Sequence, residues 1–138
     1  MINFNGTLYE ENEHYLNHDN RGLRYGDALF ETIRVVHGEP YFWEDHYLRL
    51  MASMRILRME IPMQFTMEYL LEQIGVLLTA NALEKKTVRV RLSIFRNNGG
   101  RYTPETNTIS FIIETKELDT PFYGIDDRPY VVELFKDL

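Results

Sequence analysis

Residues 87–94 read Thr-Val-Arg-Val-Arg-Leu-Ser-Ile, and this strict alternation decides the fold. Successive side chains of a β-strand point to opposite faces, so the apolar residues share one face and the polar residues share the other. The apolar face consists of Val88, Val90, Leu92 and Ile94, and the polar face of Thr87, Arg89, Arg91 and Ser93. The stretch therefore predicts a strand with one apolar face and one cationic face.

Three other segments predict strands that can pair with it. The loop at residues 97–100, followed by Pro104, leads back into the β-rich run 108–113. Asn5-Gly6 divides residues 2–9 into two short apolar flanks, which is a strong hairpin signal because both turn residues tolerate positive φ. His37-Gly38 divides residues 30–42 in the same way. We expect antiparallel strands throughout.

Two segments change to the period of a helix. From Glu44 to Leu57 apolar residues recur every three or four positions, which places them on one stripe. Thr66 is a suitable N-cap for a second helix that ends near Asn81. The apolar stripes consist of Tyr47, Leu50, Met51, Met54 and Leu57 in the first helix, and Met67, Leu70, Leu71, Ile74, Leu77 and Leu78 in the second. The sequence predicts an α+β fold, an antiparallel sheet with two packed helices.

The composition changes near the end of the chain. We expect residues 1–117 to form a small N-terminal domain. Residues 118–129 are rich in Lys, Glu, Asp, Pro and Gly, as an interdomain linker is. Residues 130–138 begin with another strand pattern, so we expect them to be the first strand of a C-terminal domain whose remainder is absent.

Composition also excludes several classes of protein. The chain has 138 residues and a net charge of −6, which gives no cationic footprint for nucleic acid. It has no cysteine, so it forms no disulfide framework or thiolate metal site. It has no apolar run that is long enough to span a membrane, and no signal-peptide pattern. We expect a soluble, cytoplasmic protein.

The residues alone leave the chemistry open. Residues 21–27 read Arg-Gly-Leu-Arg-Tyr-Gly-Asp, which is either a backbone that approaches a ligand closely or, more commonly, a loop with solvated arginines. Arg89 and Arg91 indicate either a solvated sheet face or a site for carboxylate or phosphate. Arg96, at the end of the strand, is equally ambiguous.

Three further positions are ambiguous on the same grounds. Arg49 lies toward the flank of the first helix and could be a surface residue. His14 and His18 have helical metal-site spacing, but the polar residues around them argue against a metal site. Asp45-His46 is typical of a helix N-terminal acid followed by an exposed histidine.

Residues 21–34, followed by His37-Gly38 and then by Asp45-His46-Tyr47-Leu48-Arg49-Leu50, resemble the N-terminal signature of class IV aminotransferases. This family includes branched-chain aminotransferases, D-amino-acid aminotransferases and aminodeoxychorismate lyases. The resemblance covers nearly the whole chain. It implies a two-domain enzyme that holds pyridoxal 5′-phosphate between its domains and completes its active site in a homodimer.

The resemblance also implies roles for single residues. Arg49 matches the arginine that binds the cofactor phosphate, and Tyr25, Phe30 and Glu31 match residues that line the substrate cleft. Arg91 matches an arginine near the substrate carboxylate of branched-chain enzymes. The arginine that holds the carboxylate in D-amino-acid enzymes is matched by Arg96, and residues 97–102 are similar to a glycine-rich stretch of the lyases. The arginine that binds the carboxylate is left open.

The family lysine that binds the cofactor belongs to the second domain, and Lys136 comes too early in its strand to replace it. We therefore expect no catalytic residue in this chain, and expect the chain alone to be inactive. The resemblance implies a parent enzyme that moves an amino group between an amino acid, most simply a branched-chain one, and a 2-oxo acid. The alternatives are an aminodeoxychorismate lyase, a D-amino-acid aminotransferase, or a non-catalytic ligand-binding or dimerisation module.

Overall fold

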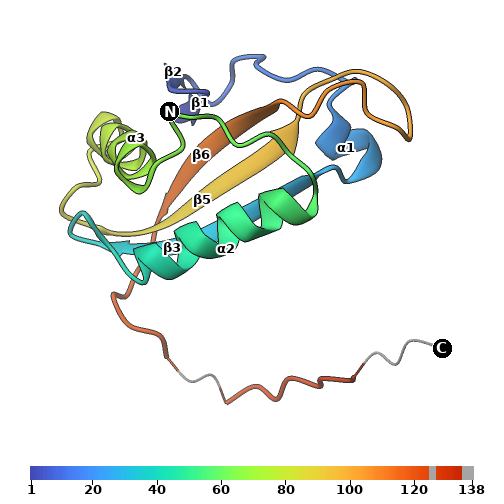
Figure 1. Ribbon diagram of the computed structural model, residues 1–138. Coiled ribbons are helices and arrows are strands. Elements are labelled where there is room, and N and C mark those ends of the chain that lie inside the picture. The colour runs from blue at the N-terminus through green and yellow to red at the C-terminus, as the bar shows by residue number, and fades with distance from the viewer. Residues whose placement is uncertain (125–126, 135–138) are drawn as a thin grey trace.

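A computed structural model describes residues 1–124 and 127–134 of the chain. In these residues a six-stranded antiparallel sheet has the strand order β2-β1-β6-β5-β3-β4. Its strands are β1 (Ile2–Phe4), β2 (Thr7–Tyr9), β3 (Ala28–Val36), β4 (Glu39–Pro40), β5 (Thr87–Arg96) and β6 (Ile109–Glu117). Figure 1 shows the three long strands β3, β5 and β6 side by side at the centre. The predicted α+β class is confirmed.

Both predicted hairpins form. Their turn residues all have positive φ: 52° at Asn5 and 86° at Gly6 in the first turn, and 50° at His37 and 83° at Gly38 in the second. Two-residue hairpin turns with positive φ at both positions match the twist of the flanking strands. The first strand pair is held further by Asn3, which is completely buried and accepts a hydrogen bond from the Gly6 N–H at 2.8 Å.

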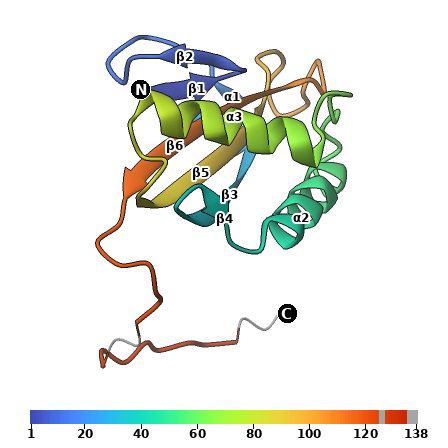
Figure 2. The ribbon, with the colours of Figure 1, turned by 90° about the vertical axis from the view of Figure 1, so that its left-hand side faces the viewer.

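The two predicted helices are α2 (Trp43–Ile56) and α3 (Met67–Ala80). Both pack on one face of the sheet, as Figure 2 shows. Thr66 caps α3, since its hydroxyl accepts a hydrogen bond from the Tyr69 N–H at 3.1 Å. The core between the layers includes Leu50, Met54, Leu70, Ile74, Leu77, Val88, Val90, Leu92 and Ile94. The apolar face predicted for residues 87–94 is therefore the core face of β5.

A third helix, α1 (Arg21–Tyr25), replaces the loop expected at residues 21–27. The Asn20 side chain accepts a hydrogen bond from the Leu23 N–H, and Gly26 ends the helix with φ 66°. These residues form a helix N-cap and a left-handed C-cap, so the sequence did contain the capping signals of this short helix. The expected loop was wrong because the glycines alone do not reveal the N-cap at Asn20.

After β6 the described residues form neither helix nor strand, and Figure 1 shows this segment leading away from the sheet. Residues 130–134 lack the predicted strand, because no described segment of this chain pairs with them; residues 135–138 lie outside the described residues. The linker and the domain boundary stay predictions. In the described part of the chain no helix is long and apolar enough to cross a membrane.

Candidate functional site

Glu31 and Arg49, two of the residues implied by the resemblance, form a bidentate ion pair. Glu31 lies on the core face of β3 and is 6% exposed, and Arg49 projects from α2. Arg49 Nε donates to one carboxylate oxygen at 2.8 Å and Nη2 donates to the other at 2.6 Å. This fork geometry fixes the plane of the guanidinium group.

His46, one turn before Arg49 in α2, contacts the same carboxylate. Its Nδ1 lies 2.7 Å from Glu31 Oε2 and 3.0 Å from Arg49 Nη2. Because a carboxylate only accepts hydrogen bonds and an arginine only donates them, Nδ1 carries a proton and donates to Glu31, and Arg49 is a second donor to the same oxygen. The expected exposed histidine was wrong: its side chain is 15% exposed, and spacing from β3 could not show this contact.

The electrostatics favour an ionised Glu31. Burial raises the pKa of this carboxyl, but the hydrogen bonds from Arg49 and His46 and their charges outweigh burial, so the net pKa lies below its usual 4.5. In the same way, Glu31 raises the pKa of Arg49 above its ordinary value. The Arg49 side chain remains 60% exposed, and its Nη1 has no hydrogen-bond partner among residues 1–124 and 127–134. A fixed cation is therefore open to an anion from solvent.

Phe30 and Arg91 meet on the other face of the sheet. Phe30 precedes Glu31 in β3 and so points away from the helices, with 55% of its surface exposed. The Arg91 guanidinium carbon lies 3.9 Å from the centre of the Phe30 ring, and its Nε donates to Ser93 Oγ at 3.2 Å. The aromatic face attracts the cation and leaves the outer edge of the guanidinium group available.

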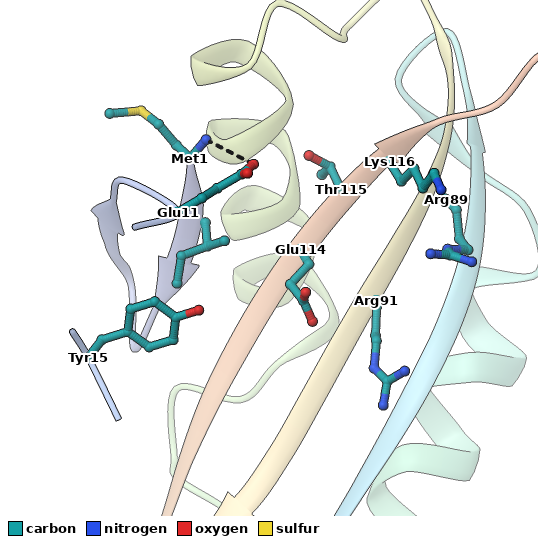
Figure 3. A pocket seen from close by; sticks show the side chains of 9 residues that line it. Met1, Glu11, Tyr15, Arg89, Arg91, Glu114, Thr115 and Lys116 are labelled. Carbon is teal, nitrogen blue, oxygen red and sulfur yellow. Dashed lines mark ion pairs between the residues drawn. The ribbon is translucent and has the colours of Figure 1, made fainter. Parts of the chain in front are cut away.

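Arg91 also borders a pocket of about 400 Å³ on this outer face. The pocket is lined by Met1, Ile2, Glu11, Tyr15, Arg89, Arg91, Glu114, Thr115 and Lys116. Figure 3 shows the cationic groups of Arg89, Arg91 and Lys116 at one side of it, with Met1, Glu11 and Tyr15 at the other. Pockets of this size hold small molecules.

Arg96 lies elsewhere, in a buried cluster around Asp27. It is 4% exposed, and its Nε donates to Asp27 Oδ2 at 2.9 Å. Its other donors bind the Leu57 and Arg58 carbonyl oxygens and the Asn107 side chain. Arg21, which is 2% exposed, donates to the same Asp27 oxygen at 2.8 Å. Neither arginine is solvated, contrary to the simplest interpretation of residues 21–27.

Tyr25 lies next to this buried cluster. Its ring contacts Tyr102 at 6.1 Å between ring centres, and the Arg21 guanidinium lies over it at 4.9 Å. A second pocket, of about 340 Å³, is lined by Arg21, Tyr25, Gly26, Asp27, Leu57, Arg96, Tyr102 and Pro104. Tyr25 and Arg96 thus share one pocket at the end of α1, whereas Phe30 and Arg91 border the outer face.

The structure therefore brings the six implied residues together in pairs. Glu31 is with Arg49, Phe30 with Arg91, and Tyr25 with Arg96. Sequence reasoning missed His46 and Asp27, which had no periodic signal. It also missed Arg34, on the outer face of β3, which donates to the carbonyl oxygens of Thr120 and Phe122 at 2.7 and 3.3 Å.

Comparison with known proteins identifies the family. The sequence pattern described as amino-transferase class IV matches residues 28–132. Aminodeoxychorismate lyase of Bacillus subtilis (strain 168) is 33% identical over 94 residues, which are 68% of this chain and 31% of that protein. D-alanine aminotransferase of Staphylococcus aureus (strain N315) is 25% identical over 128 residues, 91% of this chain and 44% of that protein.

Solved structures agree. A branched-chain amino acid aminotransferase of T.th. with pyridoxamine 5′-phosphate superposes with a TM-score of 0.72 and 25% identity, covering 86% of this chain and 40% of that one. For 4-amino-4-deoxychorismate lyase from Pseudomonas aeruginosa the TM-score is 0.64 and the identity 28%, with 85% and 40% covered. This chain belongs to the class IV aminotransferase family. It spans between about a third and a half of the length of these relatives.

Proposed function

We propose that this chain is the small domain of a pyridoxal-phosphate-dependent enzyme that moves an amino group between an amino acid and a 2-oxo acid, branched-chain in the first instance. The proposal is supported by family membership and by relatives that are named aminotransferases. It extends to amino acid and 2-oxo acid as substrates, a homodimer as the assembly and the cytoplasm as the location.

Arg49 is the residue that would hold the cofactor, and its setting carries the proposal. A phosphate group needs a cation that is accessible and fixed in direction. Arg49 meets both conditions, since Glu31 binds its Nε and Nη2 while Nη1 remains open. Bound pyridoxal phosphate would supply the electron sink for chemistry at the amino-bearing carbon.

For the substrate carboxylate we propose Arg91 in preference to Arg96. The Arg91 guanidinium is exposed and held over Phe30, whereas the donors of Arg96 already bind protein oxygens. The edge of β3 is the feature that connects the two faces. β4 pairs only with Val35 and Val36, so residues 28–33 have no strand partner on that edge among the described residues. A ligand at this edge could contact Arg49 and the outer face together.

A second candidate is an aminodeoxychorismate lyase that uses the same cofactor. The observation in its favour is the 33% identity to the B. subtilis lyase, compared with 25% to the S. aureus aminotransferase. A non-catalytic ligand-binding module is the alternative from another class.

The test uses the protein expressed from its complete gene. We expect it to bind pyridoxal phosphate with a visible absorbance band and to transfer the amino group of leucine to 2-oxoglutarate. Turnover of aminodeoxychorismate without amino transfer would select the lyase. Absence of the absorbance band would overturn both enzymatic proposals and leave the non-catalytic module.

The role of Arg49 is tested separately with Arg49→Gln. Arg55→Gln is the matched control, because Arg55 is an exposed arginine in the last turn of the same helix. Equilibrium dialysis with pyridoxal phosphate should show weaker binding by Arg49→Gln, and binding by Arg55→Gln equal to the wild type. Equal affinities in all three proteins would remove Arg49 from the phosphate role.

A further inference from the structure

Three cations stand in one row across the outer face of the sheet. The register places Arg34 of β3 opposite Arg89 of β5, and Arg89 opposite Lys116 of β6. Directly paired residues of neighbouring strands share a face, and like charges in such positions repel one another. A row of this kind destabilises the free sheet, unless the long side chains separate into solvent.

The outer members of the row differ in their contacts. Arg34 donates to two backbone carbonyl oxygens, of Thr120 and Phe122, and its guanidinium lies 4.1 Å from the centre of the Tyr123 ring. Within the part of the chain that the structure describes, Arg89 and Lys116 form no ion pair. Two adjacent cations thus lack a counter-charge.

Arg89 and Lys116 both line the 400 Å³ pocket, together with Arg91. The other charged groups of the pocket are the amino terminus, Glu11 and Glu114. The amino terminus and Glu11 pair with each other at 3.6 Å, and Glu114 lies in the next row, opposite Arg91. Figure 3 shows the three cationic side chains gathered at one side of this pocket. A small anion can therefore reach them together.

We propose that Arg89 and Lys116 form a second anion subsite, for the distal carboxylate of a dicarboxylic acid whose first carboxylate binds Arg91. This inference rests on the proposed function for the identity of the first carboxylate. Arg89 and Arg91 are two residues apart on one face, so their Cα atoms are about 6.5 Å apart at the rise of a strand. That spacing suits two carboxylates on a short carbon chain. Arg89 offers a guanidinium fork and Lys116 a second charge.

The experiment measures binding of two acids of equal carbon length, glutarate and pentanoate, to this chain without cofactor. Backbone amide shifts in NMR titrations at low salt report both affinity and location. We expect glutarate to bind about tenfold more tightly than pentanoate, because it gains one charge-assisted contact. The largest shifts should fall on β5 and β6.

Two variants and a control test the residues. Arg89→Gln and Lys116→Gln should each remove most of the preference for glutarate, while Arg55→Gln, which deletes the same charge from the helix side, should keep it. Both test residues are exposed, and unchanged circular dichroism would verify the fold.

Equal binding of glutarate and pentanoate would overturn the subsite. So would an equal loss of preference in Arg55→Gln, because net charge alone would then explain it, or binding of inorganic phosphate as tight as that of glutarate. The result is separable from the proposed function. Glutarate selectivity in a protein that binds no pyridoxal phosphate would retain the subsite and reject the cofactor, whereas cofactor binding without selectivity would do the reverse.

Discussion

The carboxylate of Glu31 accepts hydrogen bonds from both Nε and Nη2 of Arg49, a residue 18 positions further along the chain. The resemblance implied that Glu31 lines the substrate cleft and that Arg49 binds phosphate. In the structure the two residues form one unit, in which a buried carboxylate orients an exposed guanidinium group. Glu31 is thus a positioning residue for Arg49, and its replacement should affect both stability and anion binding.

The first prediction concerns stability and pH. Burial raises the pKa of Glu31, but the contacts with Arg49 and His46 outweigh burial, and the net pKa lies below 4.5. A carboxyl whose pKa is lower in the folded state stabilises the fold above its unfolded pKa and loses this contribution as the pH falls through its folded pKa. We expect the free energy of unfolding to decline below about pH 4.5.

Urea unfolding at several pH values measures this decline. In Glu31→Gln the decline should be smaller, because that carboxyl no longer titrates. Part of it should remain, since Asp27 has a pKa below its usual 3.8 for comparable reasons: burial raises it, but the hydrogen bonds from Arg21 and Arg96 prevail. Identical pH profiles for the wild type and Glu31→Gln would contradict the ion pair.

The second prediction concerns the buried cluster. Asp27→Asn leaves the guanidinium groups of Arg21 and Arg96, both nearly inaccessible, without a counter-charge. Removing one partner of a buried ion pair destabilises a protein by about 3–5 kcal/mol. Asp19→Asn is the matched control, because Asp19 pairs with Arg24 at the surface, where such pairs contribute about 0–1 kcal/mol. Equal unfolding midpoints for the two variants would refute the structural role of Asp27.

The third prediction concerns the start of α3. Thr66→Ala removes the hydroxyl that accepts the Tyr69 N–H, and losing such a cap costs about 1 kcal/mol. Thr66→Ser keeps the hydroxyl and should unfold at nearly the wild-type urea concentration. If both variants lose the same stability, the methyl group of Thr66 matters and the cap does not.

The fold could be predicted from the sequence wherever one residue pattern determined one element. The alternation at 87–94, the turns at Asn5-Gly6 and His37-Gly38, and the stripes of both long helices are local signals, and each element formed. Contacts between distant elements could not be predicted in this way. Glu31 with Arg49, and Asp27 with Arg96, come together only when β3 lies against α2 and β5.

The candidate site illustrates the same limit. The family resemblance implied which residues matter, but periodicity alone could not separate an exposed arginine from a buried one. Arg91 and Arg96 are five positions apart in one strand, yet they point to opposite faces. Odd and even positions alternate between solvent and core, so Arg91 is exposed and Arg96 is 4% exposed.

This difference gives the last prediction, which separates the two arginines as candidates for the carboxylate. Lysine keeps the charge but lacks the fork, so Arg96→Lys cannot reproduce the contacts with Asp27 and the Leu57 carbonyl oxygen. It should destabilise the fold by about 2 kcal/mol or more. Arg91→Lys changes an exposed side chain, so its unfolding free energy should change by less than about 0.5 kcal/mol. Under the proposed function, the KM for the amino acid should rise in Arg91→Lys, because a lysine neither forks to a carboxylate nor stacks on Phe30 as an arginine does. Urea unfolding and steady-state kinetics of both variants therefore form one experiment. A KM that rises only in Arg96→Lys, with its stability unchanged, would assign the carboxylate to Arg96, because a residue that serves the fold alone cannot produce that pair of results.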